Sequence, residues 1–333
     1  MTSELETYKQ NQITYLKNNY NLNLTRLNSG LVTNIKIVQK SRQSTYAKQK
    51  QINNLTIQYN NNINSLKVEL NNSIIKIQNF KLSTIKINNK KKALLVGINY
   101  TGTDNELYGC INDTINIKNK ILKNGFNEIV MLNDNTNLKP NKLNILNAFK
   151  NLLTNSKEGD LLFFLYSGHG SYTLDKNNDE ITGYDQMIVP CDLNPIIDDE
   201  LKTIIQNNLK PNVTLFAMFD SCFSGSVLDL KYQFMDSLNY DNYSENNKNF
   251  ETNGNVFMIS GCTDYQTSAD AEFNGKYNGA LTWSLLESLK QKPNCTWREL
   301  IKLMRDILKS SEYEQIPQFS CGKFENIDTP VFI

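Results

Sequence analysis

The sequence predicts an α/β fold with a mostly parallel central sheet, preceded by an amphipathic helical extension. From residue 92 onward, apolar runs alternate with helical patterns, which is typical of parallel strands connected by helices on both faces of a sheet. Two of the apolar runs end in glycine-containing loops that carry a histidine and a cysteine. Residues 1–88 contain no proline and repeat apolar residues at helical spacing. We therefore expect two domains, 1–88 and 89–333.

The extension carries one apolar stripe twice. It consists of Ile13, Leu16, Tyr20, Leu24, Leu27, Leu31, Ile35 and Val38, and the series returns 39 residues later as Ile52, Leu55, Tyr59, Ile63, Leu66, Leu70, Ile74 and Ile77. The period of 11 residues is about 3.67 residues per turn, so the stripe stays on one helix face. We interpret it as two helices joined by the polar stretch Gln39–Gln51, packed as a hairpin, on the second domain, or as an oligomeric coiled coil. The alternative is disorder, because the many asparagines are mediocre helix formers.

The extension is also strongly basic. Residues 1–92 hold 15 basic and 3 acidic side chains, whereas the remainder holds 20 basic and 31 acidic ones. A basic arm can bind nucleic acid or an anionic membrane. Packing against the acidic remainder is the simpler interpretation, and we favour it slightly.

The elements of the second domain are predicted from apolar runs and helical periodicity. Val213–Phe219, for example, is continuously apolar apart from one threonine, which is typical of a strand buried on both faces. In order, we expect strand 92–98, helix 112–124, strand 128–132, helix 141–154, strands 160–166 and 186–189, helix 198–208, strands 213–219 and 255–260, and helices 279–290 and 296–309. The polar stretch 231–254 is long for a connection, and such loops are functional or disordered. It separates a larger part, 89–230, from a smaller part, 255–333.

His169 is the only histidine in the chain and follows the apolar run that ends at Tyr166. Cys222 follows the run that ends at Phe219. Residues just beyond the carboxyl ends of neighbouring parallel strands meet at one edge of the sheet, so the two side chains can form a dyad. A thiol needs an adjacent base to become a strong nucleophile, and the same imidazole can then protonate a leaving amine. The N–H groups of Gly170 and Cys222 are candidates for an oxyanion hole.

A set of ordered motifs gives the second domain a specific resemblance. The motifs are Lys92–Tyr100, Leu107–Asp113, Tyr166–Gly170, Gly183–Asp185, Val189–Asp192, Ile197–Glu200, Asp220–Gly225, Ile259–Asp270 and Gly279–Thr282. Together they resemble the metacaspases, which are caspase-like cysteine peptidases, over residues 90–333. The resemblance implies a caspase-like α/β/α sandwich with Cys222 as nucleophile and His169 as general acid and base. Phe223 departs from the family, which usually has a second histidine after the nucleophile, and this puts only local packing or pocket shape in doubt.

Asp220 and Asp113 are expected to line one pocket beside Cys222, because their loops leave the same edge of the sheet. Two carboxylates there would receive a basic side chain. In metacaspases the matching positions select arginine or lysine, and the resemblance adds Ser167 to the pocket. Cys110 comes from the same loop as Asp113. Asp113 can also cap the helix that it opens, and both roles can hold at once.

A second acidic group consists of Asp185, Asp198, Asp199 and Asp229. Surface solvation is the ordinary fate of any one of them, but four carboxylates brought together would favour a hard cation such as Ca²⁺. The matching positions in calcium-activated metacaspases bind Ca²⁺, so we expect calcium as the cofactor.

These observations predict a Ca²⁺-activated cysteine endopeptidase that cuts proteins or peptides after arginine or lysine. In metacaspases the matching connection is where self-cleavage occurs, so the resemblance implies self-processing as a zymogen in the 231–254 loop, and we expect the cut at Lys248. The rivals are a catalytically weak scaffold acting through its helical arm, and a caspase proper that cuts after aspartate. The six cysteines lack paired spacing, and with one histidine a zinc site is not indicated. Without a signal peptide or an apolar stretch of membrane-spanning length, we expect a cytoplasmic protein.

Overall fold

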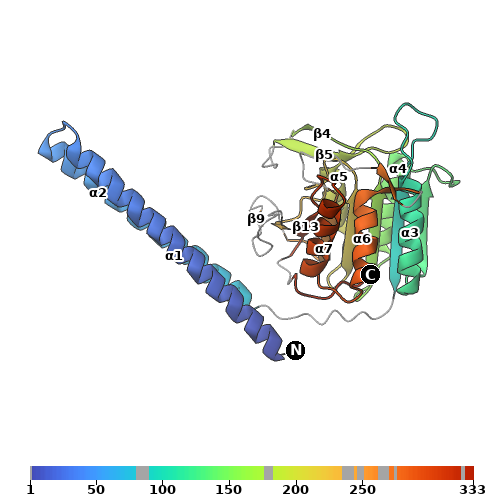
Figure 1. Ribbon diagram of the computed structural model, residues 1–333, viewed down its shortest axis with the longest axis horizontal. Helices are drawn as coiled ribbons and strands as arrows, with labels where there is room; N and C mark the ends of the chain where they lie inside the picture. Colours follow the sequence, from blue (N-terminus) through green and yellow to red (C-terminus); the bar gives the residue numbers. More distant parts are fainter. Residues whose placement is uncertain are drawn as a thin grey trace. The chain divides into compact units, whose positions relative to one another are not determined.

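The chain divides into two compact units, Met1–Thr84 and Ile85–Ile333. The computed structural model describes residues 2–79, 90–175, 183–234, 244–245, 251–261, 270–273, 276–323 and 327–333. Figure 1 shows a long helical hairpin in the first unit and a layered α/β arrangement in the second. We describe each unit by itself.

The first unit is an antiparallel hairpin of α1 (Thr2–Lys40) and α2 (Thr45–Asn79). Three cross-helix hydrogen bonds fix its register: Lys9 Nζ donates to the Gln78 carbonyl at 3.1 Å, Tyr59 Oη to Asn28, and Lys48 Nζ to the Gln39 carbonyl at 2.8 Å. In each pair the two residue numbers add to the same value, as a continuous antiparallel register requires. The two predicted helices are therefore present, but the connection is only residues 41–44, because Ser44 accepts from the Ala47 N–H and begins α2 early.

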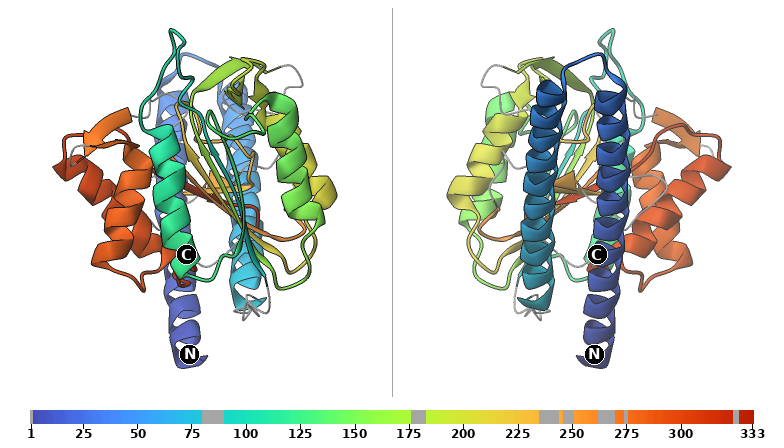
Figure 2. Two further views of the ribbon diagram at one scale, coloured as in Figure 1. Left: turned by 90° about the vertical axis from the view of Figure 1, so that its right-hand side faces the viewer. Right: turned by 90° about the vertical axis from the view of Figure 1, so that its left-hand side faces the viewer.

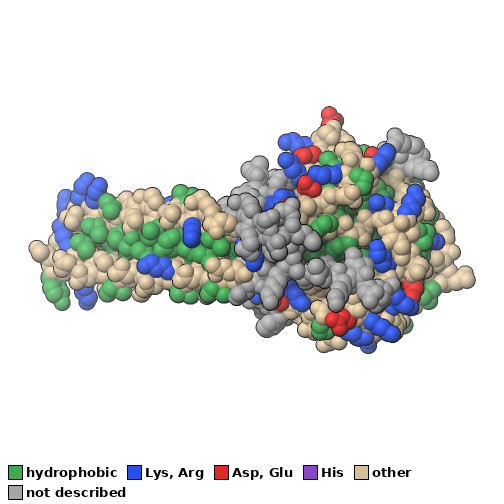
Figure 3. Space-filling view, turned by 90° about the horizontal axis from the view of Figure 1, so that it is seen from below, with side chains coloured by type: hydrophobic (Ala, Val, Ile, Leu, Met, Phe, Trp, Pro, Cys, Tyr) green, Lys and Arg blue, Asp and Glu red, His purple; other side chains and the backbone are tan. Residues whose placement is uncertain are grey.

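The predicted stripe forms the seam between the two helices. Every stripe residue is buried or half-buried, whereas most of the other described side chains of the hairpin are exposed. Only Ile13, Val38 and Ile77 are buried among the described hairpin residues, and they remain 9%, 5% and 6% exposed. Figure 3 shows hydrophobic side chains in a continuous row along one face of the hairpin. A two-helix hairpin thus covers its apolar stripe only in part.

The second unit is built on an eight-stranded sheet with the order β2-β1-β3-β7-β10-β13-β8-β9. The first five strands run parallel, and each of the last three is antiparallel to the strand before it. Their bounds are β1 Lys91–Gly97, β2 Glu128–Asn133, β3 Leu161–Ser167, β7 Thr214–Asp220, β8 Tyr232–Phe234, β9 Ser244–Glu245, β10 Asn255–Ser260 and β13 Gln318–Cys321. This arrangement confirms the mostly parallel central sheet.

Helices cover both faces of the sheet, as Figure 2 shows. One face packs against α3 (Cys110–Lys123), α6 (Ala280–Gln291) and α7 (Trp297–Ser310), and the other against α4 (Lys142–Thr154) and α5 (Asp198–Asn208). Strand β3 shows why helices are needed on both faces. Phe163 and Leu165 pack in the core beneath α3, α6 and α7, whereas Phe164 and Tyr166 pack in the core beneath α4 and α5. Successive strand side chains point to opposite faces, so a fully apolar strand supplies two cores.

Two small sheets lie outside the main one. One contains β4 (Gly170–Leu174), β5 (Tyr184–Ile188) and β6 (Ile196–Ile197), and the other pairs β11 (Asp270–Phe273) with β12 (Lys276–Gly279). Of these five strands only β5 was predicted. The stretch expected to be a polar loop also differs, because β8 enters the main sheet through buried Tyr232 and Phe234. Residues 235–243 and 246–250 of that stretch lie outside the described residues.

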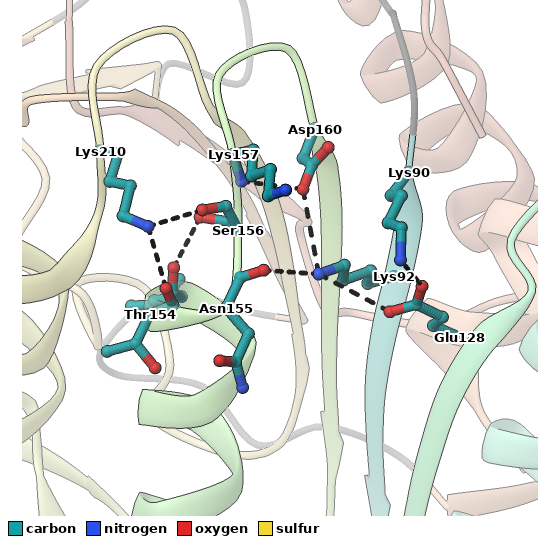
Figure 4. Close-up of polar contacts among 10 residues, drawn as sticks. Lys90, Lys92, Glu128, Thr154, Asn155, Ser156, Lys157, Asp160 and Lys210 are labelled. Atoms are coloured by element: carbon teal, nitrogen blue, oxygen red, sulfur yellow. Dashed lines mark hydrogen bonds and ion pairs between the residues drawn. The ribbon is translucent and has the colours of Figure 1, made fainter.

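A polar network ties the amino-terminal end of β1 to its neighbours (Figure 4). Lys90 pairs with Glu128 of β2 at 2.6 Å. Buried Lys92 donates to the Asn155 carbonyl after α4 at 2.6 Å and lies 3.9 Å from Asp160, just before β3. The start of β1 is therefore bonded to β2, to the residue after α4 and to the residue before β3. Among the described residues, no helix is both long enough and apolar enough to cross a membrane.

Candidate active site

The register of two central strands places the two predicted dyad residues just beyond neighbouring strand ends. Ser167 at the end of β3 lies opposite Asp220 at the end of β7, and each dyad residue, His169 or Cys222, follows two residues later. The loops touch directly: a Cβ atom on Gly170 would lie 2.0 Å from the Cys222 carbonyl oxygen. Only glycine allows this approach. The backbones that carry the two predicted oxyanion donors, Gly170 and Cys222, are thus in contact.

Two buried tyrosines hold the loop that carries His169. The His169 N–H donates to Tyr100 Oη at 2.9 Å, and Tyr166 Oη donates to the His169 carbonyl at 2.8 Å. The imidazole also packs on the Tyr100 ring, with centroids 4.7 Å apart. Burial raises the pKa of both phenols well above the ordinary value, so they act as neutral hydrogen-bonding groups. The sequence did not point to either tyrosine as a positioning residue.

The imidazole is oriented by a backbone carbonyl. His169 Nε2 lies 2.8 Å from the Asn105 carbonyl oxygen. A carbonyl can only accept, so Nε2 carries the proton of the neutral ring and Nδ1 is the unprotonated nitrogen. Cys222, the predicted nucleophile, is half-buried. This orienting contact could not be predicted, because a carbonyl leaves no signature in the side-chain sequence.

The predicted specificity residues Asp113 and Asp220 form what we call the aspartate pair. Both are buried. Asp113 Oδ2 accepts from Ser167 Oγ at 2.7 Å and from the Gly279 N–H at 3.1 Å, and Asp220 Oδ2 accepts from the N–H and hydroxyl of Thr282 at 2.8 and 2.9 Å. A Cβ atom on Gly279 would lie 2.2 Å from Asp220 Oδ2 and 2.9 Å from Asp113 Oδ2. The two carboxylates therefore converge on Gly279, at the amino terminus of α6.

The capping role considered for Asp113 is wrong. Helix α3 begins at Cys110 with Gly109 as its N-cap and no side-chain cap, so Asp113 lies inside the first turn. Its described hydrogen-bond donors are Ser167 and Gly279, which belong to other elements. Cys110 lies one turn before Asp113, is buried, and its carbonyl packs against Gly97 at the end of β1.

The predicted calcium residues form a second group, which we call the acidic cluster. Carboxylate oxygens of Asp185 on β5 and of Asp198 and Asp199 at the start of α5 all lie within 4.8 Å of one another. Burial, together with the nearby charges of Asp229 and Asp185, raises the pKa of Asp198 to about 8. Asp229 itself lies 3.4 Å from Lys202 Nζ. Three predicted ligands are thus adjacent, and the fourth is close enough to act on Asp198 electrostatically.

The donor set of the acidic cluster fits a hard cation. It offers carboxylate oxygens only, which are the ligands that Ca²⁺ prefers. Without a cation, burial and the neighbouring carboxylates favour a protonated Asp198 at neutral pH, and Lys202 supplies a positive charge beside Asp229. A bound divalent ion would offset the same excess of negative charge.

The two remaining sequence observations concern Phe223 and Lys248. Phe223 has a left-handed backbone, with φ of 52°, and its ring packs against Tyr172 on β4. Lys248, the predicted self-cleavage residue, lies outside the described residues. Lys231, the other basic residue of the predicted loop, is 3.4 Å from Glu245 and 5.6 Å from the centroid of the Tyr232 ring.

Comparisons with known proteins agree with the resemblance seen in the sequence. A family model described as metacaspase, peptidase C14 domain, matches residues 91–231. Metacaspase-1 of Scheffersomyces stipitis is 37% identical over 286 residues, covering 70% of this chain and 71% of that protein. Metacaspase-1A of Aspergillus oryzae is 37% identical over 295 residues, covering 72% and 70%. A solved structure of a Geobacter sulfurreducens protein superposes with a TM-score of 0.54 at 24% identity, covering 72% of this chain and 95% of that one, and supports the fold.

Proposed function

The chain belongs to the metacaspase family of cysteine peptidases and is a hydrolase of peptide bonds; we propose that it cleaves after arginine or lysine and that calcium activates it. The observation that carries the specificity is the convergence of two buried carboxylates, Asp113 and Asp220, beside the dyad loops. A guanidinium or ammonium group placed between them would gain charge-assisted hydrogen bonds. An aspartate side chain would meet two like charges there, which argues against cleavage after aspartate.

In the reaction we propose, His169 acts first as base and then as acid. His169 Nδ1 takes the proton of the Cys222 thiol, and the thiolate sulfur attacks the carbonyl carbon of the scissile bond. The N–H groups of Gly170 and Cys222 stabilise the negative oxygen that develops. The imidazolium then donates its proton to the leaving amine, and water hydrolyses the thioester that remains.

Matched peptides test the specificity. Fluorogenic peptides that differ only in arginine, lysine or aspartate before the bond should be cleaved in the first two cases and not in the third. Cleavage only after aspartate would contradict the proposal and indicate a caspase proper. A weakly active scaffold would instead show no difference between wild type and Cys222→Ala.

Calcium is proposed to bind at the acidic cluster. Asp185, Asp198, Asp199 and Asp229 would hold it, and the ion would supply fixed positive charge where β5 meets α5. Titration calorimetry of the intact chain with Ca²⁺ should give one binding event that Asp198→Asn weakens at least tenfold and that Asp306→Asn, on the exposed side of α7, leaves unchanged. Full peptidase activity in excess EGTA would contradict the activating role.

Self-processing is proposed at Lys248. The described contacts of Lys231 with Glu245 and Tyr232 make that residue a poorer site, because the bond after Lys231 leads into strand β8, whose backbone is paired in the sheet and is not free to enter the active site. At the junction between the units, Lys91 and Lys92 belong to β1 and are equally restrained, which leaves positions up to Lys90 for secondary cuts. Mass spectrometry after Ca²⁺ addition should find a new amino terminus at Asn249 in wild type and none in Cys222→Ala. An active enzyme that stays intact would contradict it.

A reducing, cytoplasmic setting is proposed because the nucleophile is a thiol. Thiols stay reduced in that compartment, whereas oxidising compartments convert them to disulfides. Fractionation with an antibody against the chain tests this proposal.

A further inference from the structure

We propose that one face of the β4–β5 ribbon is a subsite for an apolar side chain on the substrate residue that follows the cleaved bond. This subsite, which we call the aromatic face, consists of Phe223, Tyr172, Leu174 and Tyr184. The inference rests on the peptidase activity and on arginine or lysine occupying the aspartate pair as proposed above.

The aromatic face begins at the nucleophile itself. Gly170, the first residue of β4, packs directly against the Cys222 carbonyl. Alternate residues of a strand share one face, so Tyr172 and Leu174 lie on the same side of β4 as Gly170. Leu174 is opposite Tyr184 in the β4–β5 register. A continuous row of side chains therefore leads away from Cys222 along the ribbon.

Phe223 connects the nucleophile loop to this row. Its ring centroid is 4.9 Å from that of Tyr172, and Tyr172 is 5.2 Å from Tyr184, both in edge-to-face geometry. Phe223 is the residue next to Cys222, so it continues the row of aromatic side chains to the nucleophile loop.

The row is open to solvent. Tyr172 is 48% exposed, Leu174 is 69% exposed and Tyr184 is 38% exposed, whereas every residue of the central strands β3 and β7 is buried. Grouped exposed apolar side chains are typical of binding surfaces. A surface that begins at the catalytic cysteine is positioned for the substrate chain, so a substrate side chain is the occupant to which we commit.

The position of the aspartate pair decides which substrate residue lies there. Asp113 on α3 and Gly279 before α6 belong to one side of the main sheet, where α3 and α6 pack. Ile188 of β5 and Ile196 of β6 belong to the core cluster on the other side, with α5. A peptide that places its basic residue at the aspartate pair and its carbonyl at Cys222 therefore continues toward the ribbon. The residue after the bond meets the aromatic face.

The test uses a peptide library randomised on both sides of the cleaved bond, with products sequenced by mass spectrometry. The residue before the bond reports on the proposed arginine or lysine specificity, and the residue after it reports independently on the aromatic face. We expect wild type to favour phenylalanine, leucine or tyrosine after the bond. In matched peptides, Arg-Phe should exceed Arg-Ser in kcat/KM by about tenfold, the usual scale for an apolar side chain in an apolar site.

Variants assign the preference to these residues. Tyr172→Ser and Phe223→Asn should each reduce the Phe-to-Ser ratio to about threefold or less, and asparagine tolerates the positive φ at position 223. Leu143→Ser, an equally exposed apolar residue on α4, should leave the ratio unchanged. No apolar preference in wild type would overturn the inference, as would a preference that both variants retain. Either result would leave the specificity before the bond intact.

Discussion

The helical hairpin of the first unit and the second unit, Ile85–Ile333, which we call the peptidase unit, bury their apolar side chains to different extents. Every residue of β3 and β7 is buried, and their side chains alternate between two cores that are each closed by helices. In the hairpin, a single seam between α1 and α2 leaves most of the stripe half-exposed. The two helices of the hairpin follow from local periodicity and pack on each other along one seam, whereas the peptidase unit depends on contacts among many strands and helices that are distant in the chain.

The difference matters for function because catalysis needs fixed geometry. The candidate site takes its residues from the ends of β3 and β7, from α3, and from the start of α6, all anchored in closed cores. Well-packed cores hold side chains in single rotamers, which is what a dyad and an oriented carboxylate pair require. We therefore expect substitutions in the peptidase unit to change activity or stability strongly, and matched substitutions in the hairpin to change either one weakly.

The largest effect is expected at the dyad. Cys222→Ala and His169→Ala should each reduce kcat/KM by roughly a thousandfold or more, because neither nucleophile nor base has a substitute. Active-site titration and peptide cleavage measure the loss, and an unchanged unfolding midpoint serves as the control. Turnover of a few per cent in His169→Ala would remove the histidine from the mechanism.

A pair of leucine substitutions compares the two cores directly. Leu165→Ala in β3 should lower the free energy of unfolding by about 3–4 kcal/mol, whereas Leu27→Ala in the half-open seam should cost about 1 kcal/mol. Both tryptophans of the chain, Trp283 and Trp297, lie in the peptidase unit. The midpoint of denaturant unfolding followed by tryptophan fluorescence should therefore shift for Leu165→Ala only. The unfolding curve followed by far-UV circular dichroism should also change for Leu27→Ala. Equal losses of unfolding free energy in the two variants would mean that the seam is packed as tightly as the core of the sheet.

The aspartate pair should give the next largest effect. Asp220→Asn removes a charge that faces the proposed substrate cation, a contact worth roughly 1.5–3 kcal/mol, so kcat/KM for an arginine peptide should fall about ten- to hundredfold. Asp306→Asn, the same change at an exposed position, is the control. Unchanged arginine cleavage in Asp220→Asn would exclude the pair as the specificity site.

A smaller effect is expected where a residue acts through another. Tyr100→Phe removes the hydroxyl that accepts from the His169 N–H and donates to the Val189 carbonyl, so the imidazole loses part of its support. Only the bond to the His169 N–H acts on the imidazole, and at about 1 kcal/mol its loss should lower kcat roughly fivefold while KM stays unchanged. A rise in KM with kcat unaffected would contradict a positioning role.

Much of this fold could be predicted because its central strands are apolar on both faces. Strand β10 and helix α5 have the bounds expected from the sequence, since a continuous apolar run and a first turn of three acidic residues are strong local signals. Strands β8, β9 and β13 could not be predicted in the same way. They are two to four residues long, and they become strands only by pairing with distant segments.

The residues of the candidate site likewise differ in whether a local sequence pattern identifies them. His169 and Cys222 were recognisable because each follows an apolar strand at a fixed offset. Asn105 acts through its carbonyl, Gly279 through its N–H and its missing side chain, and Tyr100 through a hydroxyl that reaches back from another loop. None of these roles has a local sequence signature, because each depends on a neighbour brought close by the tertiary fold.

The charge at the aspartate pair can be tested most directly with arginine and citrulline, which have nearly the same shape but differ in charge. In otherwise identical peptides, wild type should cleave after arginine at least a hundredfold more efficiently than after citrulline, about 2.7 kcal/mol of charge-dependent stabilisation. In Asp220→Asn the ratio should fall to about tenfold or less, because one of the two carboxylates is neutral. Equal cleavage of the two peptides by wild type would contradict the claim that Asp113 and Asp220 select a cationic side chain.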